Sequence, residues 1–164
     1  MKYLVFSDID GTFMSHENYS FKNLREYVQK IKKNCAVIFV SSKTFEEMKF
    51  IKDRLGIEFP FISENGACIY FPESYMSKKI SNAEFFEIDN YLGFLVFKNH
   101  LETKNELKKL KKKFNFHFFS DLKDEFLSKV TNLKEKDLLR SKKRFYSDPI
   151  YWNDSKEKLN LFFK

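Results

Sequence analysis

The stretch KYLVFSDIDGT, residues 2–12, decides the fold. Residues 2–7 form a short apolar run with the Val, Phe and Tyr content of a buried β-strand. Asp8 follows this run directly, and Asp10, Gly11 and Thr12 complete the stretch. In open parallel sheets, ligands bind at the carboxyl ends of the strands. The stretch therefore predicts a strand whose carboxyl end carries a ligand site.

The two carboxylates of this stretch are candidate metal ligands. Asp8 and Asp10 are two residues apart, so they project from the same side of the strand end, and Gly11 allows a sharp turn beside them. Such a pair repels unless a cation lies between its members, and hard oxygen ligands beside a phosphate favour Mg²⁺. The alternative interpretation is a simple turn at Asp10-Gly11 that is capped by Asp8.

The chain then alternates between helical and strand patterns. Residues 20–33 have apolar side chains at helical spacing, and residues 35–40 (CAVIFV) form a second apolar run. A second helix, with its apolar stripe from Phe45 to Leu55, is expected to stop at Gly56. Strand, helix, strand and helix in this order are typical of a parallel sheet. The predicted fold class is therefore α/β, with a Rossmann-like core of a parallel sheet and flanking helices.

The remaining patterns predict a second domain. Two further strands, 59–62 and 67–71, flank a turn at Glu64-Asn65-Gly66, where Asn-Gly supplies positive φ angles. The polar stretch 72–82 marks the boundary, which gives a core over residues 1–80 and an α+β domain over residues 81–164. The elements expected in the second domain are a strand near 84–88, a helix containing Leu107, Leu110 and Phe114, a strand at 114–119, a helix near 122–130 and a helix from 155 onward.

The charge of the chain suits an anionic small substrate. Thirty Lys and Arg against 23 Asp and Glu give a net charge of +7, mostly from Lys, which solvates a surface more often than it reads bases. The run Lys108 to Lys113 raises the alternative of a surface for nucleic acid or acidic membranes. Leu107, Leu110 and Phe114 interrupt that run at helical spacing, which indicates the solvated face of a helix. We therefore expect a phosphorylated small molecule as partner, and neither nucleic acid nor membrane.

Cysteine and histidine usage indicates neither disulfides nor a soft-metal site. Cys35 and Cys68 each lie in an apolar run without a partner at metal-ligand spacing, so we expect free thiols in a reducing compartment. The three histidines also share no ligand spacing. No signal peptide and no apolar run near the ~18 residues of a membrane span are found. The expected location is the cytoplasm.

The motif at residues 8–12 resembles the first motif of the haloacid dehalogenase superfamily, D-x-D-G-T, at every defined position. The resemblance implies a Mg²⁺-dependent phosphatase with an inserted cap domain. It gives Asp8 the role of nucleophile, forming an aspartyl-phosphate, and Asp10 the role of general acid and base. Both carboxylates would hold Mg²⁺, with Gly11 and Thr12 at the phosphate.

Two later segments extend this resemblance. Ser41, Ser42 and Lys43 follow the second predicted strand, where the superfamily has a Ser or Thr that hydrogen-bonds the phosphoryl group, a role that falls to Ser41. Lys43 opens the next helix, where its charge and free N–H groups suit an anion; the alternative is a capped helix start with a solvated Lys. Asn65 and Gly66 match an Asn-Gly-Ala segment that lies beside the substrate cleft in the Cof-like branch.

Within that branch the chain looks most like the mannosyl-3-phosphoglycerate phosphatase family. Its segment R-x-Y-S-E-P, which closes the cap, is similar to Arg144-Phe145-Tyr146-Ser147-Asp148-Pro149. The resemblance makes Arg144 a substrate-binding residue, although Asp148 replaces Glu, and Phe145 stands where an acidic residue is common. The implied reaction converts a sugar-linked phosphoglycerate to a sugar-linked glycerate and phosphate.

Two parts of the superfamily pattern are not found in the chain. A later Lys and a final acidic pair follow the cap in the superfamily, and the chain ends with the cap. Asp121 and Asp124 resemble that acidic pair, but we interpret them as the start of a helix in the cap, with Ser120 or Asp121 as its N-cap. The alternative function is therefore a truncated, inactive remnant that acts at most as a phosphate-ligand-binding module.

Overall fold

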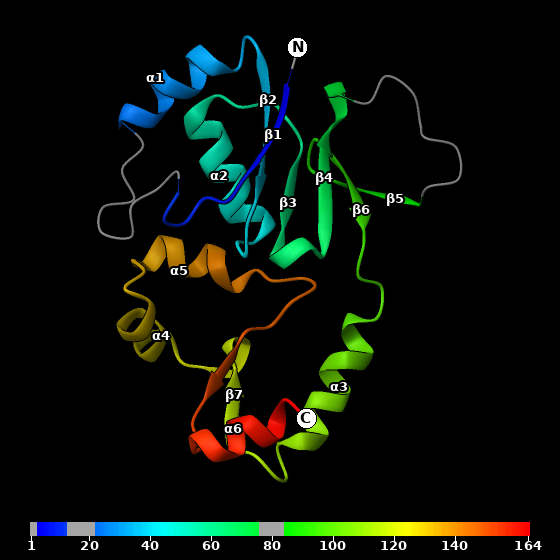
Figure 1. Ribbon diagram of the computed structural model, residues 1–164, viewed down its shortest axis with the longest axis vertical. Coiled ribbons are helices and arrows are strands. Elements are labelled where there is room, and N and C mark those ends of the chain that lie inside the picture. The colour runs from blue at the N-terminus through cyan, green and yellow to red at the C-terminus, as the bar shows by residue number, and fades with distance from the viewer. Residues whose placement is uncertain (1–2, 13–21, 76–83) are drawn as a thin grey trace. The chain divides into compact units, whose positions relative to one another are not determined.

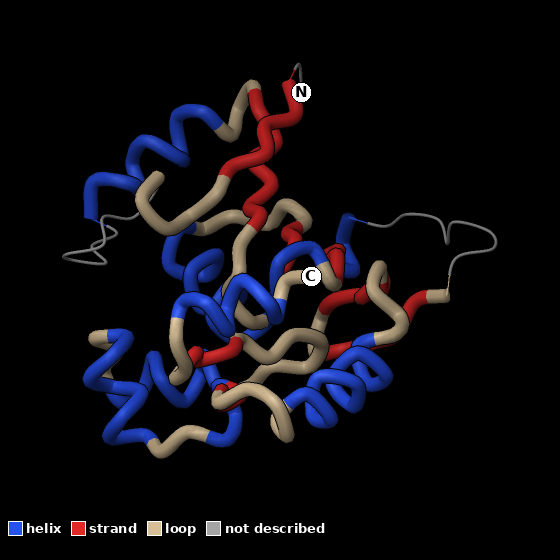
Figure 2. Tube along the Cα trace, turned by 60° about the horizontal axis from the view of Figure 1, so that its bottom comes forward, coloured by secondary structure: helices blue, strands red, loops and turns tan. Residues whose placement is uncertain are grey.

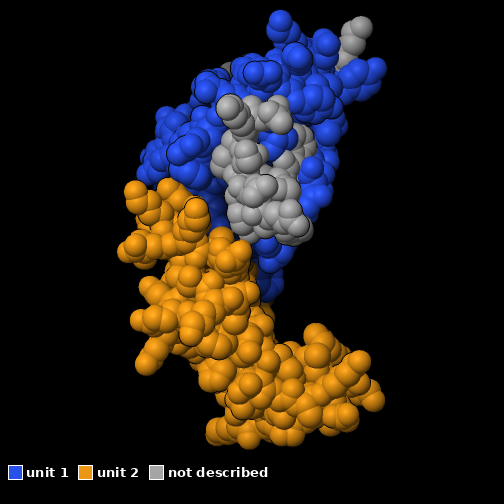
Figure 3. Space-filling model, turned by 90° about the vertical axis from the view of Figure 1, so that its left-hand side faces the viewer, with its two compact units in different colours: residues 1–97 blue, residues 98–164 orange. Residues whose placement is uncertain are grey.

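The computed structural model describes residues 3–12, 22–75 and 84–164. The chain divides into two compact units, residues 1–97 and 98–164, which Figure 3 shows in different colours. The predicted boundary stretch, residues 72–82, lies mostly outside the described residues. We describe the two units separately.

The first unit is built on a six-stranded sheet of order β1-β2-β3-β4-β6-β5 (Figure 1). The neighbouring strands β1, β2 and β3 run parallel, whereas β4, β5 and β6 form antiparallel pairs. The parallel part is the predicted one, so the α/β fold class is confirmed. The strands are β1 (Tyr3–Ser7), β2 (Cys35–Val40), β3 (Phe61–Ser63), β4 (Cys68–Pro72), β5 (Phe85–Ile88) and β6 (Tyr91–Leu95).

Two helices connect the parallel strands, as predicted. Helix α1 (Lys22–Ile31) links β1 to β2, and α2 (Phe45–Leu55) links β2 to β3. Helix α2 ends at Gly56, which has a left-handed conformation with φ of 65° and whose N–H donates to the carbonyls of Asp53 and Lys52. Two short 3₁₀ turns follow, η1 (Glu64–Gly66) and η2 (Glu73–Tyr75). No helix among the described residues is long and apolar enough to cross a membrane.

Strand β1 is not buried, contrary to the expectation from its composition. It lies at the edge of the sheet and pairs with β2 on one side. Its side chains are exposed on both faces, with exposed fractions of 66% for Tyr3, 59% for Leu4 and 60% for Phe6. The apolar run correctly predicts a strand. Whether the side chains of that strand are buried depends on which other elements pack against it, and the run does not report that.

An aromatic cluster forms the core between α2 and the sheet. Phe45 of α2, Phe61 of β3, Tyr70 of β4 and Tyr91 of β6 are all buried. Phe61 stacks on Tyr70 with ring centroids 5.0 Å apart, and Phe45 lies 4.7 Å from the Tyr70 ring. Aromatic rings gain stability from such contacts in addition to burial. This cluster fixes α2 against the strands whose ends carry the candidate site.

The hairpin of β5 and β6 continues the first sheet instead of beginning a second domain. β6 pairs with β4 from Cys68↔Leu95 to Pro72↔Tyr91, and β5 pairs with β6. The turn between them has Asp89 at a positive φ of 49°. The first compact unit therefore extends to Phe97, beyond the expected boundary at residue 80. The assignment of the second unit as a cap domain stays a prediction.

The second unit is mostly helical, around the short antiparallel pair of β7 (Phe116–Phe118) and β8 (Ile150–Trp152) (Figure 2). Phe116, Phe118, Leu127 and Leu138 form its buried core. The predicted strand at 114–119 is confirmed in its central part, and the last helix begins after Ser155 as expected. The helices are α3 (His100–Leu110), the 3₁₀ turn η3 (Phe119–Asp121), α4 (Asp124–Thr131), α5 (Glu135–Lys142) and α6 (Lys156–Phe162).

Candidate active site

Asp8 and Asp10 leave the end of β1 through a tight turn. The Asp8 carboxylate is exposed and accepts a hydrogen bond from the Ile9 N–H at 2.7 Å. Gly11 has φ of 78°, a left-handed conformation that a residue without Cβ adopts at little cost, and the Thr12 N–H donates to the Ile9 carbonyl at 3.3 Å. The turn exists as predicted, and it leaves the Asp8 carboxylate in solvent.

An ion pair joins the end of β1 to the start of α2. The Lys43 ammonium lies 3.0 Å from the Asp10 carboxylate, and the two side chains are 11% and 27% exposed. The Lys43 side chain is mostly covered rather than solvated, and it faces a predicted site residue, while its role toward an anion stays a prediction. The structure brings the first two motifs together here.

The turn after β3 joins the same site through backbone hydrogen bonds. The Asn65 N–H donates to the Ser41 carbonyl at 3.1 Å, and the Glu64 N–H donates to the Lys43 carbonyl at 2.9 Å. Asn65 and Gly66 have positive φ angles of 61° and 91°, as predicted for this turn. Ser42 and Asn65 are exposed beside these contacts. Residues 41–43 and 64–66 thus lie side by side at the strand ends.

Ser41 is the buried member of this group. It is 4% exposed, and its hydroxyl accepts a hydrogen bond from the Lys43 N–H at 3.3 Å. Its N–H donates to the Ile62 carbonyl of β3 at 3.1 Å. These bonds hold the end of β2 beside the end of β3. The role of Ser41 toward a phosphoryl group stays a prediction.

A capping box fixes the first turn of α2, and the site analysis from sequence did not include it. The buried Thr44 hydroxyl accepts from the Glu47 N–H at 3.2 Å, and the Glu47 carboxylate accepts from the Thr44 N–H at 2.9 Å. The Thr-x-x-Glu spacing was a sufficient signal for this arrangement. The box fixes Thr44 at the start of α2, and so it also fixes the position of the preceding residue, Lys43, whose ammonium meets Asp10.

Replacing Thr44 with Ala is expected to lower the free energy of unfolding by about 1 kcal/mol, because one N–H of the first turn loses its acceptor. Urea unfolding followed by circular dichroism measures this change. Thr44→Ser is the matched control, since it keeps the hydroxyl and should recover most of the loss. Equal stabilities of Thr44→Ala and Thr44→Ser would contradict the role of the cap.

Arg144 belongs to the second unit, whereas the other predicted site residues belong to the first. Its guanidinium donates to the Ser147 carbonyl at 3.0 Å and to the Ser147 hydroxyl at 2.7 Å. Asp148, which replaces the Glu of the related family, forms an ion pair with Lys104 at 2.5 Å and accepts from the Ser120 N–H at 3.0 Å. Asp148 is thus held inside the second unit, and the substrate role of Arg144 stays a prediction.

Asp121 and Asp124 have ion-pair partners within the second unit. Asp121 lies in η3, 2.8 Å from the Lys111 ammonium, and Asp124 lies in the first turn of α4, 2.5 Å from that of Lys142. The pKa of Asp121 is lowered, mainly by its hydrogen bond with Lys111. The N-cap of α4 is Lys123 rather than Ser120 or Asp121, because the chain first makes the turn η3.

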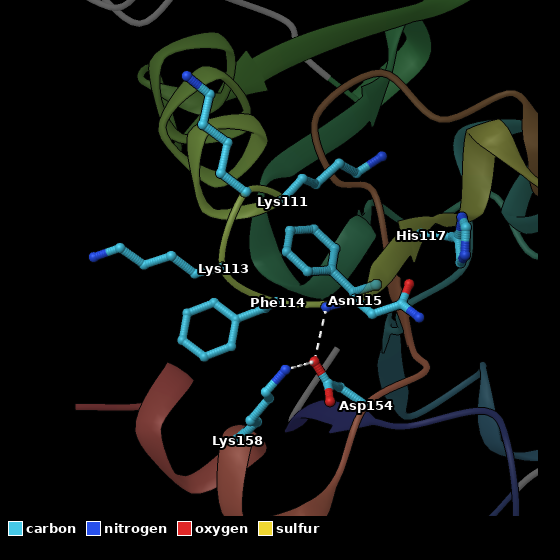
Figure 4. A pocket seen from close by; sticks show the side chains of 9 residues that line it. Lys111, Lys113, Phe114, Asn115, His117, Asp154 and Lys158 are labelled. Atoms are coloured by element: carbon cyan, nitrogen blue, oxygen red, sulfur yellow. Dashed lines mark hydrogen bonds and ion pairs between the residues drawn. The ribbon is translucent and has the colours of Figure 1, made fainter.

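A pocket of about 440 Å³ lies in the second unit (Figure 4). Among the residues that line it, the Asp154 carboxylate accepts hydrogen bonds from the Asn115 N–H at 3.1 Å and from the Lys158 ammonium at 3.0 Å. Lys113 points away from the ring of Phe114 into solvent. The lysines at 108, 109 and 111–113 are exposed as predicted, but α3 ends at Leu110, so the last three lie in the turn after the helix and not on its face. The pocket includes none of the predicted site residues.

The donors for a metal ion are the two carboxylates after β1. The described residues contain no group of three or more His, Cys, Asp or Glu side chains that would hold a metal ion. Mg²⁺ is typically held by one or two carboxylates together with waters and phosphate oxygens. Asp8 and Asp10 fit that requirement in number and in chemistry, and their side chains are accessible.

The fold and the site together define an α/β protein of the Rossmann-like class, with an acidic site at the carboxyl ends of its parallel strands. The sequence model of the haloacid dehalogenase-like hydrolases matches residues 5–162. The chain therefore belongs to the haloacid dehalogenase-like hydrolase family, which confirms the prediction made from residues 8–12.

Two curated relatives share the family. The glucosyl-3-phosphoglycerate/mannosyl-3-phosphoglycerate phosphatase of Persephonella marina is 33% identical over 155 residues, which cover 94% of this chain and 56% of the relative. The protein of the same name from Methanococcoides burtonii is 33% identical over 151 residues, covering 90% and 55%. The predicted resemblance is confirmed, and the chain spans about half the length of these relatives.

Two solved structures support the fold. A haloacid dehalogenase-like hydrolase from B. subtilis has a TM-score of 0.55 at 20% identity, covering 99% of this chain and 65% of that chain. A protein from Thermotoga maritima has a TM-score of 0.57 at 20% identity, covering 98% and 59%. At these identities the likeness concerns the fold alone.

Proposed function

We propose that this chain carries the nucleophile-bearing part of a Mg²⁺-dependent phosphomonoester hydrolase that works through an aspartyl-phosphate. The observation that supports it best is the Asp10–Lys43 ion pair of 3.0 Å beside the exposed Asp8 carboxylate. This arrangement places two carboxylates and the Lys43 ammonium together at the ends of two neighbouring parallel strands. Membership of the hydrolase family agrees with this reaction class.

In the first step, the Asp8 carboxylate attacks the phosphorus atom of the substrate. The new P–O bond to Asp8 forms as the bond to the substrate oxygen breaks, and Asp10 gives its proton to the leaving alkoxide. The exposure of Asp8 supports this role, because the carboxylate is accessible for in-line attack. Lys43 and the first turn of α2 supply positive charge and N–H groups toward the phosphoryl oxygens.

In the second step, Asp10 removes a proton from water, which attacks the phosphorus atom of the aspartyl-phosphate. The bond between phosphorus and Asp8 breaks, inorganic phosphate leaves, Asp8 is again a carboxylate, and Asp10 again carries the proton with which the first step began. Ser41 would hold the phosphoryl group during both steps. Its burial and its hydrogen bonds to the backbone give it one fixed position for that task.

Asp8 and Asp10 are the residues that would hold Mg²⁺. When bound, the ion neutralises charge on the carboxylates and phosphoryl oxygens and makes attack by an anion easier. Gly11 and Thr12, which form the exposed turn beyond Asp10, would lie next to the phosphate. With two carboxylates as the only protein ligands among the described residues, we expect weak binding of Mg²⁺ by this chain alone.

The proposed substrate is a sugar-linked phosphoglycerate. The names of the two relatives, each 33% identical, support this choice, since both are glucosyl-3-phosphoglycerate/mannosyl-3-phosphoglycerate phosphatases. Asn65, Gly66 and Arg144 are the residues we assign to substrate binding. A cytoplasmic location is proposed as well, and the unpaired thiols of Cys35 and Cys68 support it.

The experiment that tests the function is Mg²⁺-dependent phosphate release from mannosyl-3-phosphoglycerate and from p-nitrophenyl phosphate. This chain is compared with a chain extended through the following coding segment, with and without EDTA. Because the chain spans 56% of its relative, we expect little turnover by this chain and full turnover by the extended one. Preference for the sugar substrate would support the proposed specificity.

The second candidate function is a phosphate-ligand-binding module without chemistry. It is favoured by the described residues, which contain no group of three or more side chains that could hold a metal ion. Activity in neither chain, with intact folding and measurable phosphate binding, would support this module and overturn the hydrolase. Phosphate release that does not depend on a divalent cation would overturn the metal-dependent mechanism.

A further inference from the structure

Lys52 lies in the last turn of α2 with a fully buried side chain, 0% exposed. Its Nζ donates a hydrogen bond to the Phe59 carbonyl. It also lies 4.7 Å from the centroid of the Phe61 ring and 5.0 Å from that of Tyr91. Among the described residues no carboxylate forms an ion pair with Lys52. The charged Lys52 ammonium has three N–H donors. Among the described residues it meets one oxygen acceptor and two aromatic faces.

The surroundings of Lys52 favour its neutral form. Burial is the largest influence and lowers the Lys52 pKa from 10.5 to about 7, against the weaker attraction of Asp53 and Glu58. Tyr91 on β6 stays neutral over the same range, because burial raises its pKa to about 12. The amine and the ammonium are therefore both populated near pH 7.

The other groups around this position do not neutralise the ammonium. One turn earlier on α2, Lys49 pairs with Asp89 of the β5–β6 turn at 2.5 Å, which occupies that carboxylate. On the sheet side, β3 presents the Phe61 ring, and β4 presents Tyr70 behind it. Aromatic faces attract a cation, but they do not replace the hydrogen bonds that water gives to an ammonium.

Lys52 connects two elements that carry the candidate site. Helix α2 begins directly after residues 41–44, and the Phe59 carbonyl belongs to the segment that leads into β3 and the turn 64–66. We propose that Lys52 is a proton-sensitive contact between α2 and β3, which packs as a neutral amine and loosens when it becomes an ammonium. The packing behind the candidate site would then respond to pH near neutrality.

The direction of the pH effect follows from the two states of the chain. The unfolded chain keeps the Lys52 pKa at its ordinary value of 10.5, whereas folding lowers it to about 7. Between these values the unfolded state binds more protons than the folded state, so Lys52 makes the free energy of unfolding rise with pH. The contribution of Lys52 to the free energy of unfolding is fully present above pH 10.5, and it is lost as the pH falls to about 7.

A direct titration tests the proposal. The protein is labelled with ¹⁵N- and ¹³C-lysine, and the Lys52 resonances are followed from pH 5.5 to 10.5, with assignment by the Lys52→Met variant. We expect Lys52 to titrate near pH 7, well below the ordinary pKa of 10.5 for its side chain. Titration of Lys52 at pH 9 or higher would overturn the proposal.

Thermal unfolding as a function of pH gives a second test. Relative to Lys52→Met, the melting temperature of the wild type should rise by roughly 7–14 °C between pH 7 and pH 10, at the ~2–4 °C per kcal/mol typical of this size. The control Lys33→Met removes an exposed lysine of the same unit, distant in sequence from α2, and should leave the pH profile of the wild type in place. Parallel pH profiles of wild type and Lys52→Met would overturn the proposal.

Amide hydrogen exchange tests the link to the site. The reporters are the Met48 N–H, which donates to Thr44 in the first turn of α2, and the Glu64 N–H, which donates to Lys43. Their protection factors should fall between pH 8 and pH 6 in the wild type and stay constant in Lys52→Met. Constant protection in both proteins would limit Lys52 to a local effect and overturn the coupling to the site.

Discussion

Asp8→Asn is expected to lower phosphate release by at least ~1,000-fold in the form of the protein that hydrolyses the substrate, because an amide cannot form the aspartyl-phosphate. The fold should not change, since Asp8 is exposed and its one hydrogen bond within the turn is to the next N–H. Initial rates of phosphate release at saturating Mg²⁺ measure the effect. Removing a charge of −1 should also weaken Mg²⁺ binding.

The control for this prediction is Asp53→Asn, which makes the same chemical change at an exposed position on α2. It should retain the activity of the wild type within about twofold. Asp10→Asn separates the two carboxylates, because loss of the general acid slows release of a poor leaving group more than that of p-nitrophenolate. An Asp8→Asn protein that kept the wild-type rate of phosphate release would show that Asp8 is not the nucleophile.

Phe61→Ala is expected to cost about 4 kcal/mol of the free energy of unfolding, the largest stability effect we predict. Phe61 is fully buried, stacks on Tyr70 at 5.0 Å and lies 5.5 Å from the Tyr91 ring. It also pairs with Phe39 of β2 on one side. Its removal leaves a cavity at the centre of the sheet, and the melting temperature should fall by roughly 8–16 °C.

Phe6→Ala is the matched control, because it deletes the same ring from β1 of the same sheet, where the side chain is 60% exposed. Its cost should stay below ~1 kcal/mol. Urea unfolding of both variants, followed by circular dichroism, gives the comparison. Similar losses for the two variants would mean that β1 is covered in solution and that the cluster around Phe61 is not the main core.

Much of the first unit was predictable because its signals are local. The strand at 35–40 and the helix from Phe45 to Gly56 are found at the expected residues, since apolar periodicity and a C-terminal Gly report the local backbone directly. The strand β6 was not predicted. Tyr91-Leu-Gly-Phe-Leu has a Gly in its centre and follows a turn without a Pro or Gly, so its strand signal is weak.

The sequence by itself determined the motif at residues 8–12, the order of strands and helices around it and the family of the protein. The tertiary structure alone decided that β1 lies at an exposed edge, that Lys43 meets Asp10 and that Lys52 is buried. The reason is physical. Backbone conformation depends mainly on neighbours in the chain, whereas burial and charge pairing depend on which distant elements pack together.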